Sequence, residues 1–260
     1  MSRWSNKRKK RLLFIIITIA LVVFGIIAYS ILDRPATCFD GVQNASETGV
    51  DCGGSCELVC RGEVRDIVVW WERPFKVADG VYNTVAYIEN QNLDSGLEEL
   101  RYEFRLYNYD NVLVSEPVTG TTFIEPNKRS AIFESGITTG NQEAYTAFFK
   151  VSSAQDWKRT DQSFAYNLFQ ISEPQLTNQD VAPKIQVNIR NSSFQSFNDI
   201  PVIAIIYNQD DNAIASSQTY IDRIGQDQDA IAYFSWPEPF KDPVSRIEII
   251  PRVNPFANGF

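Results

Sequence analysis

The stretch that decides the fold is YEFRLY, residues 102–107, in which bulky apolar and charged residues alternate without a break. Successive side chains of a β-strand point to opposite faces of the sheet, so Tyr102, Phe104 and Leu106 share one face. The other face carries Glu103 and Arg105. Such alternation is typical of an antiparallel sheet with one buried and one solvated face.

Similar short runs precede and follow this strand. Residues 67–71, 84–88 and 144–151 are rich in β-branched and aromatic residues, and turn-forming residues separate them. No helical period of useful length occurs after residue 32. The sequence therefore predicts a mainly β chain, with a first β-sandwich over residues 63–152.

The same order of features recurs about 100 residues later. Asn90 corresponds to Asn191, and the four-residue pattern Tyr-Asn-x-Asp occurs at residues 107–110 and again at 207–210. We predict a second sandwich over residues 164–260 and a polar linker over 153–163. Neither sandwich contains a cysteine, so the expected architecture is two tandem immunoglobulin-like or fibronectin-like domains without an inter-sheet disulfide.

The strand FRLYN, residues 104–108, resembles the signature strand of FxLYD-type domains, which are β-sandwich modules of exported prokaryotic proteins. Asn108 stands where that family usually has an acid, and the second copy reads AIIYN, residues 204–208, without the first aromatic. The resemblance implies an accessory or interaction module rather than a catalyst.

A long apolar run precedes the β region. Residues 12–32 read LLFIIITIALVVFGIIAYSIL and contain no charge, whereas residues 1–11 contain six basic residues and no acid. At about 1.5 Å per residue this run spans a bilayer core. The positive-inside rule places the N-terminus in the cytoplasm. We predict a single-pass signal anchor in the cell membrane with an extracytoplasmic C-terminal bulk; a signal peptide cleaved near Ala28 is the alternative.

All four cysteines lie in a predicted stalk module over residues 33–62, at Cys38, Cys52, Cys56 and Cys60. An even, clustered set on the exported side predicts two disulfides, and the sequence leaves all three pairings open. The segment resembles a cysteine-rich repeat of bacterial surface proteins with the pattern C-x-DG-x-x-N-x-x-E-x-x-x-DCGG-x-C. That resemblance implies an extracellular, disulfide-held module of a membrane-anchored prokaryotic envelope protein.

The stalk module also carries a candidate metal site. Oxygen donors at Asp40, Asn44, Glu47 and Asp51 are of the kind that calcium prefers, so calcium is a possible cofactor. Two alternatives stay open. The same residues commonly cap tight turns, and four thiolates can hold zinc or an iron–sulfur cluster.

Charge and composition exclude several classes of protein. Beyond the basic tail, 18 basic residues face 32 acidic ones, a formal charge of −14, and such a body repels nucleic-acid phosphates. The chain contains no histidine, which removes Ser-His-Asp and Cys-His catalysis and histidine-ligated metals. We therefore expect neither nucleic-acid binding nor enzymatic activity.

The pair Trp70-Trp71 is the candidate binding feature of the first sandwich. Alternation along a strand predicts opposite faces for the two rings, one in the core and the other exposed for stacking on a sugar or a neighbouring domain.

These observations predict a non-catalytic, membrane-anchored extracytoplasmic protein that binds or scaffolds other molecules of the cell envelope. Its partners would be the membrane, through residues 12–32, and an envelope protein or glycan. The alternative is a bitopic subunit of an envelope assembly for secretion, pilus formation or division, and an envelope hydrolase is the remote alternative.

Overall fold

The computed structural model describes residues 3–32 and 37–257. Residues 1–2, 33–36 and 258–260 lie outside the described part, as do the ends of the predicted basic tail, stalk and second sandwich that fall on them. The chain divides into two compact units, Met1–Cys56 and Glu57–Phe260. Each unit is described by itself.

The first unit begins with the predicted apolar helix. Helix α1 covers Arg3–Leu32, and its window Arg8–Tyr29 has a mean hydropathy of 3.0 with none of that described window buried. Twenty-two residues at about 1.5 Å each span the hydrocarbon core of a bilayer. An apolar surface on all sides of a helix of this length is typical of a membrane span, so α1 can anchor the chain in a membrane.

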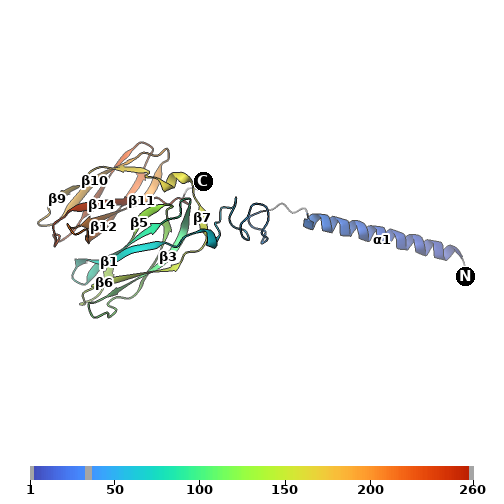
Figure 1. Ribbon diagram of the computed structural model, residues 1–260, viewed down its shortest axis with the longest axis horizontal. Helices are drawn as coiled ribbons and strands as arrows, with labels where there is room; N and C mark the ends of the chain where they lie inside the picture. The colour runs from blue at the N-terminus through green and yellow to red at the C-terminus, as the bar shows by residue number, and fades with distance from the viewer. Residues whose placement is uncertain (1–2, 33–36, 258–260) are drawn as a thin grey trace. The chain divides into compact units, whose positions relative to one another are not determined.

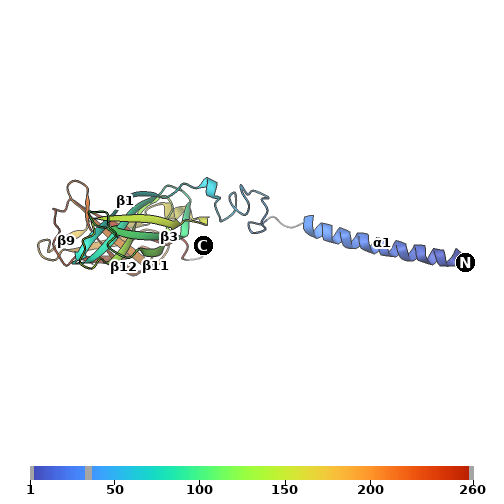
Figure 2. The ribbon, with the colours of Figure 1, turned by 90° about the horizontal axis from the view of Figure 1, so that it is seen from below.

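The second unit is mainly β and contains two sandwiches of antiparallel strands (Figures 1 and 2). In the first, the sheet β1-β2-β5 packs against β4-β3-β6, and in the second β13-β10-β8 packs against β12-β11-β14. The short strands β7 and β9 extend two of these sheets by pairing with β3 and β10. The strands of the first sandwich are β1 Val68–Ala78, β2 Val81–Asn90, β3 Ser95–Tyr107, β4 Val118–Ile124, β5 Lys128–Thr138, β6 Thr146–Ser153 and β7 Trp157–Arg159. Those of the second are β8 Phe169–Ile171, β9 Gln175–Thr177, β10 Lys184–Asn191, β11 Phe197–Tyr207, β12 Ala213–Ile224, β13 Asp229–Ser235 and β14 Arg246–Pro251.

The alternation of residues 102–107 is confirmed in β3. Tyr102, Phe104 and Leu106 are buried between the two sheets of the first sandwich, and Phe104 packs on Phe149 with ring centroids 4.9 Å apart. A fully buried phenylalanine of this kind contributes about 3–5 kcal/mol, measured as the cost of truncation to alanine.

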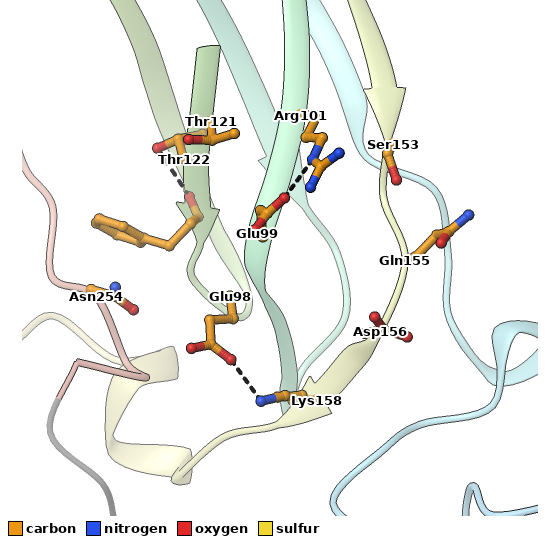
Figure 3. A pocket seen from close by; sticks show the side chains of 11 residues that line it. Glu98, Glu99, Arg101, Thr121, Thr122, Ser153, Gln155, Asp156, Lys158 and Asn254 are labelled. Carbon is orange, nitrogen blue, oxygen red and sulfur yellow. Dashed lines mark hydrogen bonds and ion pairs between the residues drawn. The ribbon is translucent and has the colours of Figure 1, made fainter.

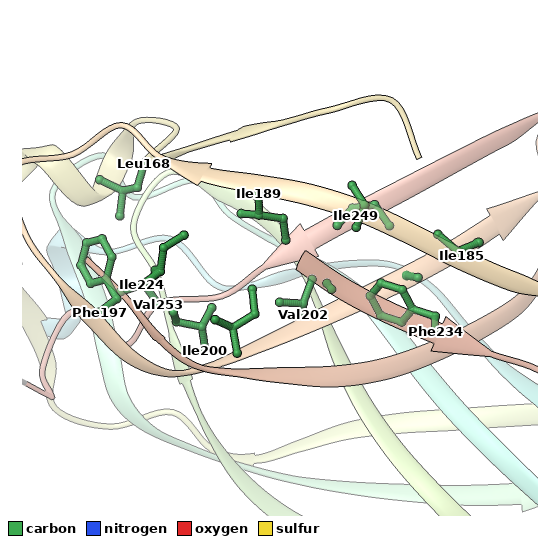
Figure 4. Close-up of a cluster of buried hydrophobic side chains, with 14 of the residues drawn as sticks. Leu168, Ile185, Ile189, Phe197, Ile200, Val202, Ile224, Phe234, Ile249 and Val253 are labelled. Atoms are coloured by element: carbon green, nitrogen blue, oxygen red, sulfur yellow. The ribbon is translucent and has the colours of Figure 1, made fainter. Parts of the chain in front are cut away.

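The core of the second sandwich is richer in aliphatic side chains (Figure 4). Ile185 and Ile189 of β10 face Val202 of β11 and Ile249 of β14, and Phe197 lies near one end of the core. The β-branched residues that fill this core also have the highest preference for extended backbone, so local propensity and burial favour the same strands.

A third apolar layer joins the two sandwiches. Val85 of β2 and Ala131 of β5 pack against Ile203 and Ile205 of β11, so four sheets form one stack. Residues 202–207, VIAIIY, form a continuous apolar run because β11 is buried on both faces. Glu248 strengthens the junction by accepting hydrogen bonds from the hydroxyls of Tyr87, at 2.7 Å, and Tyr207, at 2.9 Å.

The segment expected to be a linker is part of the first sandwich. Trp157 of β7 is buried in the core, and its carbonyl accepts a hydrogen bond from the backbone of Val59. Residues 57–62, the end of the predicted stalk, therefore belong to the second unit, where a 3-10 helix covers Arg61–Glu63. A second 3-10 helix, Gln162–Ala165, follows β7. Burial of a large aromatic outweighed the polar composition of the segment.

Candidate binding site

Two irregular positions disturb the sheet β4-β3-β6. On β3, Leu97 pairs with Ile124 and Leu100 with Thr122, so Glu98 and Glu99 together oppose the single residue Phe123. On β6, a second extra residue lies opposite the peptide between Arg101 and Tyr102. Such β-bulges bend a strand and change the direction of its side chains, and they are frequent next to functional sites.

An open hollow with a volume of about 830 Å³ lies at these bulges (Figure 3). We call it the bulge hollow. Hydroxyl, amide and charged side chains dominate its lining, and Phe123 provides its one apolar side chain. The lining residues are Glu98, Glu99, Arg101, Thr121, Thr122, Phe123, Ser153, Gln155, Asp156, Lys158 and Asn254.

The charges of the bulge hollow are mostly paired. The ammonium of Lys158 lies 2.6 Å from the Glu98 carboxylate and 3.5 Å from that of Glu57, and Arg101 pairs with Glu99 at 2.5 Å. The hydrogen bond to Glu98 raises the pKa of Lys158, so this cation keeps its proton. Within the described residues Asp156 makes no ion pair, and the lining therefore carries one acid more than its bases neutralise.

A buried arginine of the second sandwich holds the aromatic wall of the bulge hollow. The guanidinium of Arg252 lies 4.5 Å from the ring centroid of Phe123 and donates to Thr122 Oγ1 at 3.0 Å and to the Phe123 carbonyl. Only 4% of Arg252 is exposed, and this burial lowers the pKa of its guanidinium. The stacking fixes the orientation of the ring.

The two tryptophans expected on opposite faces lie on the same face. Trp70 Nε1 donates to Glu89 at 3.1 Å, and Trp71 stacks on Tyr87 with centroids 5.3 Å apart. Glu89 and Tyr87 are two residues apart on β2 and so share a face. The reason is a bulge at Trp70, since the register slips between Val69 and Trp71.

The exposure of the two rings differs. Trp71 packs in the layer between the sandwiches, whereas 51% of Trp70 is exposed. The guanidinium of Arg129 covers the Trp70 ring at 4.5 Å and pairs with Glu89 at 3.3 Å. Trp70 is thus a fixed aromatic ring at the surface, and its role in binding stays a prediction.

The stalk cysteines are oxidised. Cys38 and Cys56, which are 18 positions apart in the sequence, form a disulfide. Cys52 and Cys60 are disulfide-bonded as well. No thiol of the four is free for a thiolate metal centre. Disulfides persist in oxidising compartments, so the module indicates an extracytoplasmic location for this part of the chain.

The four predicted calcium ligands all take part in local hydrogen bonds. The Asp51 carboxylate accepts from the backbone N–H groups of Asp40 and Gly41 at 2.9–3.0 Å, and Asn44 Nδ2 donates to Asp40 at 2.8 Å. Glu47 accepts from the backbone of Asn44 at 3.1 Å. These carboxylates cap turns. Their binding of calcium stays a prediction.

At Gly54, in the DCGG motif, the structure requires glycine for a steric reason. Its φ is +56°, and a Cβ built there would lie 1.8 Å from the Ser46 carbonyl oxygen. We expect Gly54→Ala to prevent correct closure of the module, because strain and a backbone clash add together. Gly41 has a φ of +73° but nothing within 4 Å of its Cβ, so Gly41→Ala is the matched control. Mass spectrometry after thiol alkylation should find free cysteines in the Gly54 variant; equal oxidation of both variants would contradict this reasoning.

Sequence reasoning missed the bulge hollow because its lining comes from separate segments of the chain. One local signal exists. The doublet Glu98-Glu99 interrupts the alternation of β3 just before Leu100, and a polar doublet inside an alternating strand indicates a bulge. The contribution of Asn254 depends on the docking of the second sandwich and has no local signal.

Comparison with known proteins leaves the family open. No family model and no curated protein matches the chain. Among solved structures, it is similar to red sea bream transglutaminase, with 8% identity over 74% of this chain and 31% of that one and a TM-score of 0.23. The C-terminal globular domain of an oligosaccharyltransferase from Pyrococcus abyssi gives 10% identity, 72% and 46% coverage and a TM-score of 0.22. The chain spans less than half the length of either structure, and TM-scores this low support no conclusion about fold or function.

Proposed function

We propose that this chain is a membrane-anchored, extracytoplasmic protein of the cell envelope that binds or scaffolds another envelope molecule without catalysing a reaction. The observation that carries the proposal is the fusion of the two sandwiches. Val85, Ile203 and Ile205 are fully or almost fully buried in the layer between them, which favours one rigid presenting body over two flexibly linked domains.

Rigidity has a direct consequence for binding. A site whose side chains are already held in place loses little conformational entropy when a ligand arrives. Phe123 under Arg252 and Trp70 under Arg129 are both fixed in this way. The resemblances to a cysteine-rich surface repeat and to FxLYD-type modules support the same class of function.

The location is tested by protease accessibility. In cells expressing the full chain with a tag at each end, the proposal predicts that protease reaching only the outer face of the membrane removes the C-terminal tag and spares the N-terminal one. Protection of the C-terminal tag until the membrane is permeabilised would refute the extracytoplasmic assignment. An unrelated cytoplasmic protein serves as the integrity control.

Binding is tested by photo-crosslinking in native membranes. A photoreactive amino acid at Gln155 in the bulge hollow, or at Trp70, is expected to capture an envelope component. The same amino acid at the exposed Arg223 of β12 is the matched control. Equal capture at all three positions would show non-specific encounter and would argue against a binding role for either site.

A further inference from the structure

We propose that the bulge hollow binds a short, uncharged oligosaccharide. This inference rests on the proposed function and names the ligand class of the candidate site. Its volume of about 830 Å³ lies within the roughly 300–1,000 Å³ typical of small-ligand sites, so it takes a few sugar units.

The uncharged groups of the lining match a ligand that both donates and accepts hydrogen bonds. Five of the lining side chains are hydroxyls or amides, namely Thr121, Thr122, Ser153, Gln155 and Asn254. Each hydroxyl or amide offers donor and acceptor capacity. Gln155 is exposed and no hydrogen bond of its side chain is recorded among the described residues, so its amide is available. A polyhydroxylated ligand satisfies such groups at many points.

The single aromatic side chain suits the apolar face of a sugar ring. Phe123 is partly exposed and lies opposite Glu98 and Glu99, whose carboxylates accept hydrogen bonds at the edge of the hollow. Arg252 supports the ring through its cation–π contact and so leaves a fixed, flat apolar surface within a polar frame.

Charge argues against anionic ligands. Arg101 and Lys158, the two cations of the lining, are already paired with Glu99 and Glu98, and Asp156 adds an unpaired negative charge. A phosphate-rich or sulfated ligand would meet repulsion without a free cation. A peptide is also disfavoured, because peptide grooves depend on several apolar anchor pockets, and Phe123 is the one apolar side chain in the lining.

The test uses the full chain in micelles of a detergent without a sugar headgroup. The probes are cellotetraose, maltotetraose, mannotetraose and chitotetraose, titrated by calorimetry and by ligand-observed NMR. We expect at least one of them to bind and a heparin tetrasaccharide to bind more weakly. Absence of binding by all four neutral probes, or tighter binding of heparin, would overturn the inference.

Two variants localise the site. Phe123→Leu keeps apolar volume but removes the flat ring, and we expect about a tenfold loss of affinity. Gln155→Ala removes an exposed amide that the fold does not use, and we expect an affinity loss of about threefold with unchanged thermal stability. Phe148→Leu is the matched control, because Phe148 is a half-exposed aromatic of β6 outside the lining.

Each result decides a specific point. Equal losses for Phe148→Leu and Phe123→Leu would place the glycan elsewhere. If neither Phe123→Leu nor Gln155→Ala changed the affinity, the glycan would likewise have to bind outside the bulge hollow. Failure of every sugar probe alongside specific crosslinking from the hollow in native membranes would reject the ligand class and leave the proposed binding function in place.

Discussion

Replacing Arg252 by alanine is expected to lower the free energy of unfolding of the second unit by about 3 kcal/mol, because it removes one partner of a buried ion pair. Arg252 follows β14 of the second sandwich, and Glu125 follows β4 of the first. Their side chains are 5% and 2% exposed, with Nε and Oε2 3.9 Å apart. The pair therefore fastens one sandwich to the other.

The size of this loss of stability depends on the hydrogen bonds and ion pairs that the former partners of Arg252 keep after its removal. Without Arg252, the Thr122 hydroxyl and the Phe123 carbonyl lose their donor, while Glu125 keeps Lys128 at 3.2 Å and the Val253 backbone N–H at 3.2 Å. An uncompensated buried charge costs 3–5 kcal/mol in typical cases, and the remaining contacts place the expectation near 3 kcal/mol.

Denaturant unfolding of the full chain in detergent micelles, followed by tryptophan fluorescence, measures the effect. Arg223→Ala, at an exposed position of β12, is the control and should change stability by less than about 0.5 kcal/mol. The double variant Arg252→Met, Glu125→Gln should lose less than the sum of Arg252→Met and Glu125→Gln measured singly, because each partner's cost includes the other's unpaired state. Strict additivity, or a loss below about 1 kcal/mol for Arg252→Ala, would show that the pair does not join the sandwiches.

The strands were predictable from the sequence where one face is buried and the other solvated. Tyr102, Phe104 and Leu106 occupy the core face that their spacing predicts. The long apolar helix and the disulfide-held stalk followed from length, charge and cysteine spacing. These features depend on local sequence, so a reading of local patterns is sufficient for them.

The docking of the sandwiches was not predicted, although the sequence contains a signal for it. Residues 202–207 form an unbroken apolar run, and such a run indicates a strand buried on both faces. At Ala204, where the FxLYD pattern has an aromatic, the side chain is completely buried against the second core. The loss of the aromatic thus coincides with a strand that must pack on two sides.

Bulges explain the errors at candidate sites. The period-two rule assumes an unbroken ladder, and one extra residue at Trp70 was enough to bring both tryptophans to one face. The same kind of irregularity at Glu98 and Glu99 forms the hollow. A bulge depends on pairing with a partner strand, so a single strand's sequence signals it only weakly.

Equal and large losses of stability are expected from Asn90→Ala in the first sandwich and Asn191→Ala in the second. Both side chains are almost completely buried, with 2% and 0% exposed. Asn90 Nδ2 donates to the carbonyls of Ser95 and Glu125, each at 2.8 Å. Asn191 Nδ2 donates in the same way to Gln195, at 2.6 Å, and Gly225, at 3.0 Å.

The acceptor side of the two amides matches as well. Asn90 Oδ1 accepts from the backbone N–H of Asn92, and Asn191 Oδ1 accepts from that of Ser193, each at 3.0 Å. Each asparagine therefore ties the loop after its own strand to the turn that precedes another strand of the same sheet. Each Oδ1 also accepts a side-chain hydrogen bond, from Asn92 Nδ2 to Asn90 and from Ser193 Oγ to Asn191. Truncation therefore removes four bonds and leaves buried carbonyls unpaired. At about 1 kcal/mol per bond, the loss should be about 4 kcal/mol at either position.

Thermal and denaturant unfolding of the full chain measures the loss of stability in each of the two variants. The control is Asn198→Ala, at an exposed position of β11, which should change the free energy of unfolding by less than about 0.5 kcal/mol. Similar losses would support duplication of one ancestral domain, which the offset of about 100 residues predicts, because the same amide would then perform the same structural role twice. A loss confined to one sandwich would argue that the other asparagine is dispensable. The two asparagines would then correspond in sequence position but not in their contribution to stability. Asn90→Asp and Asn191→Asp sharpen the comparison: an aspartate cannot donate to the two carbonyls and buries a charge, so each should destabilise more than the corresponding alanine variant.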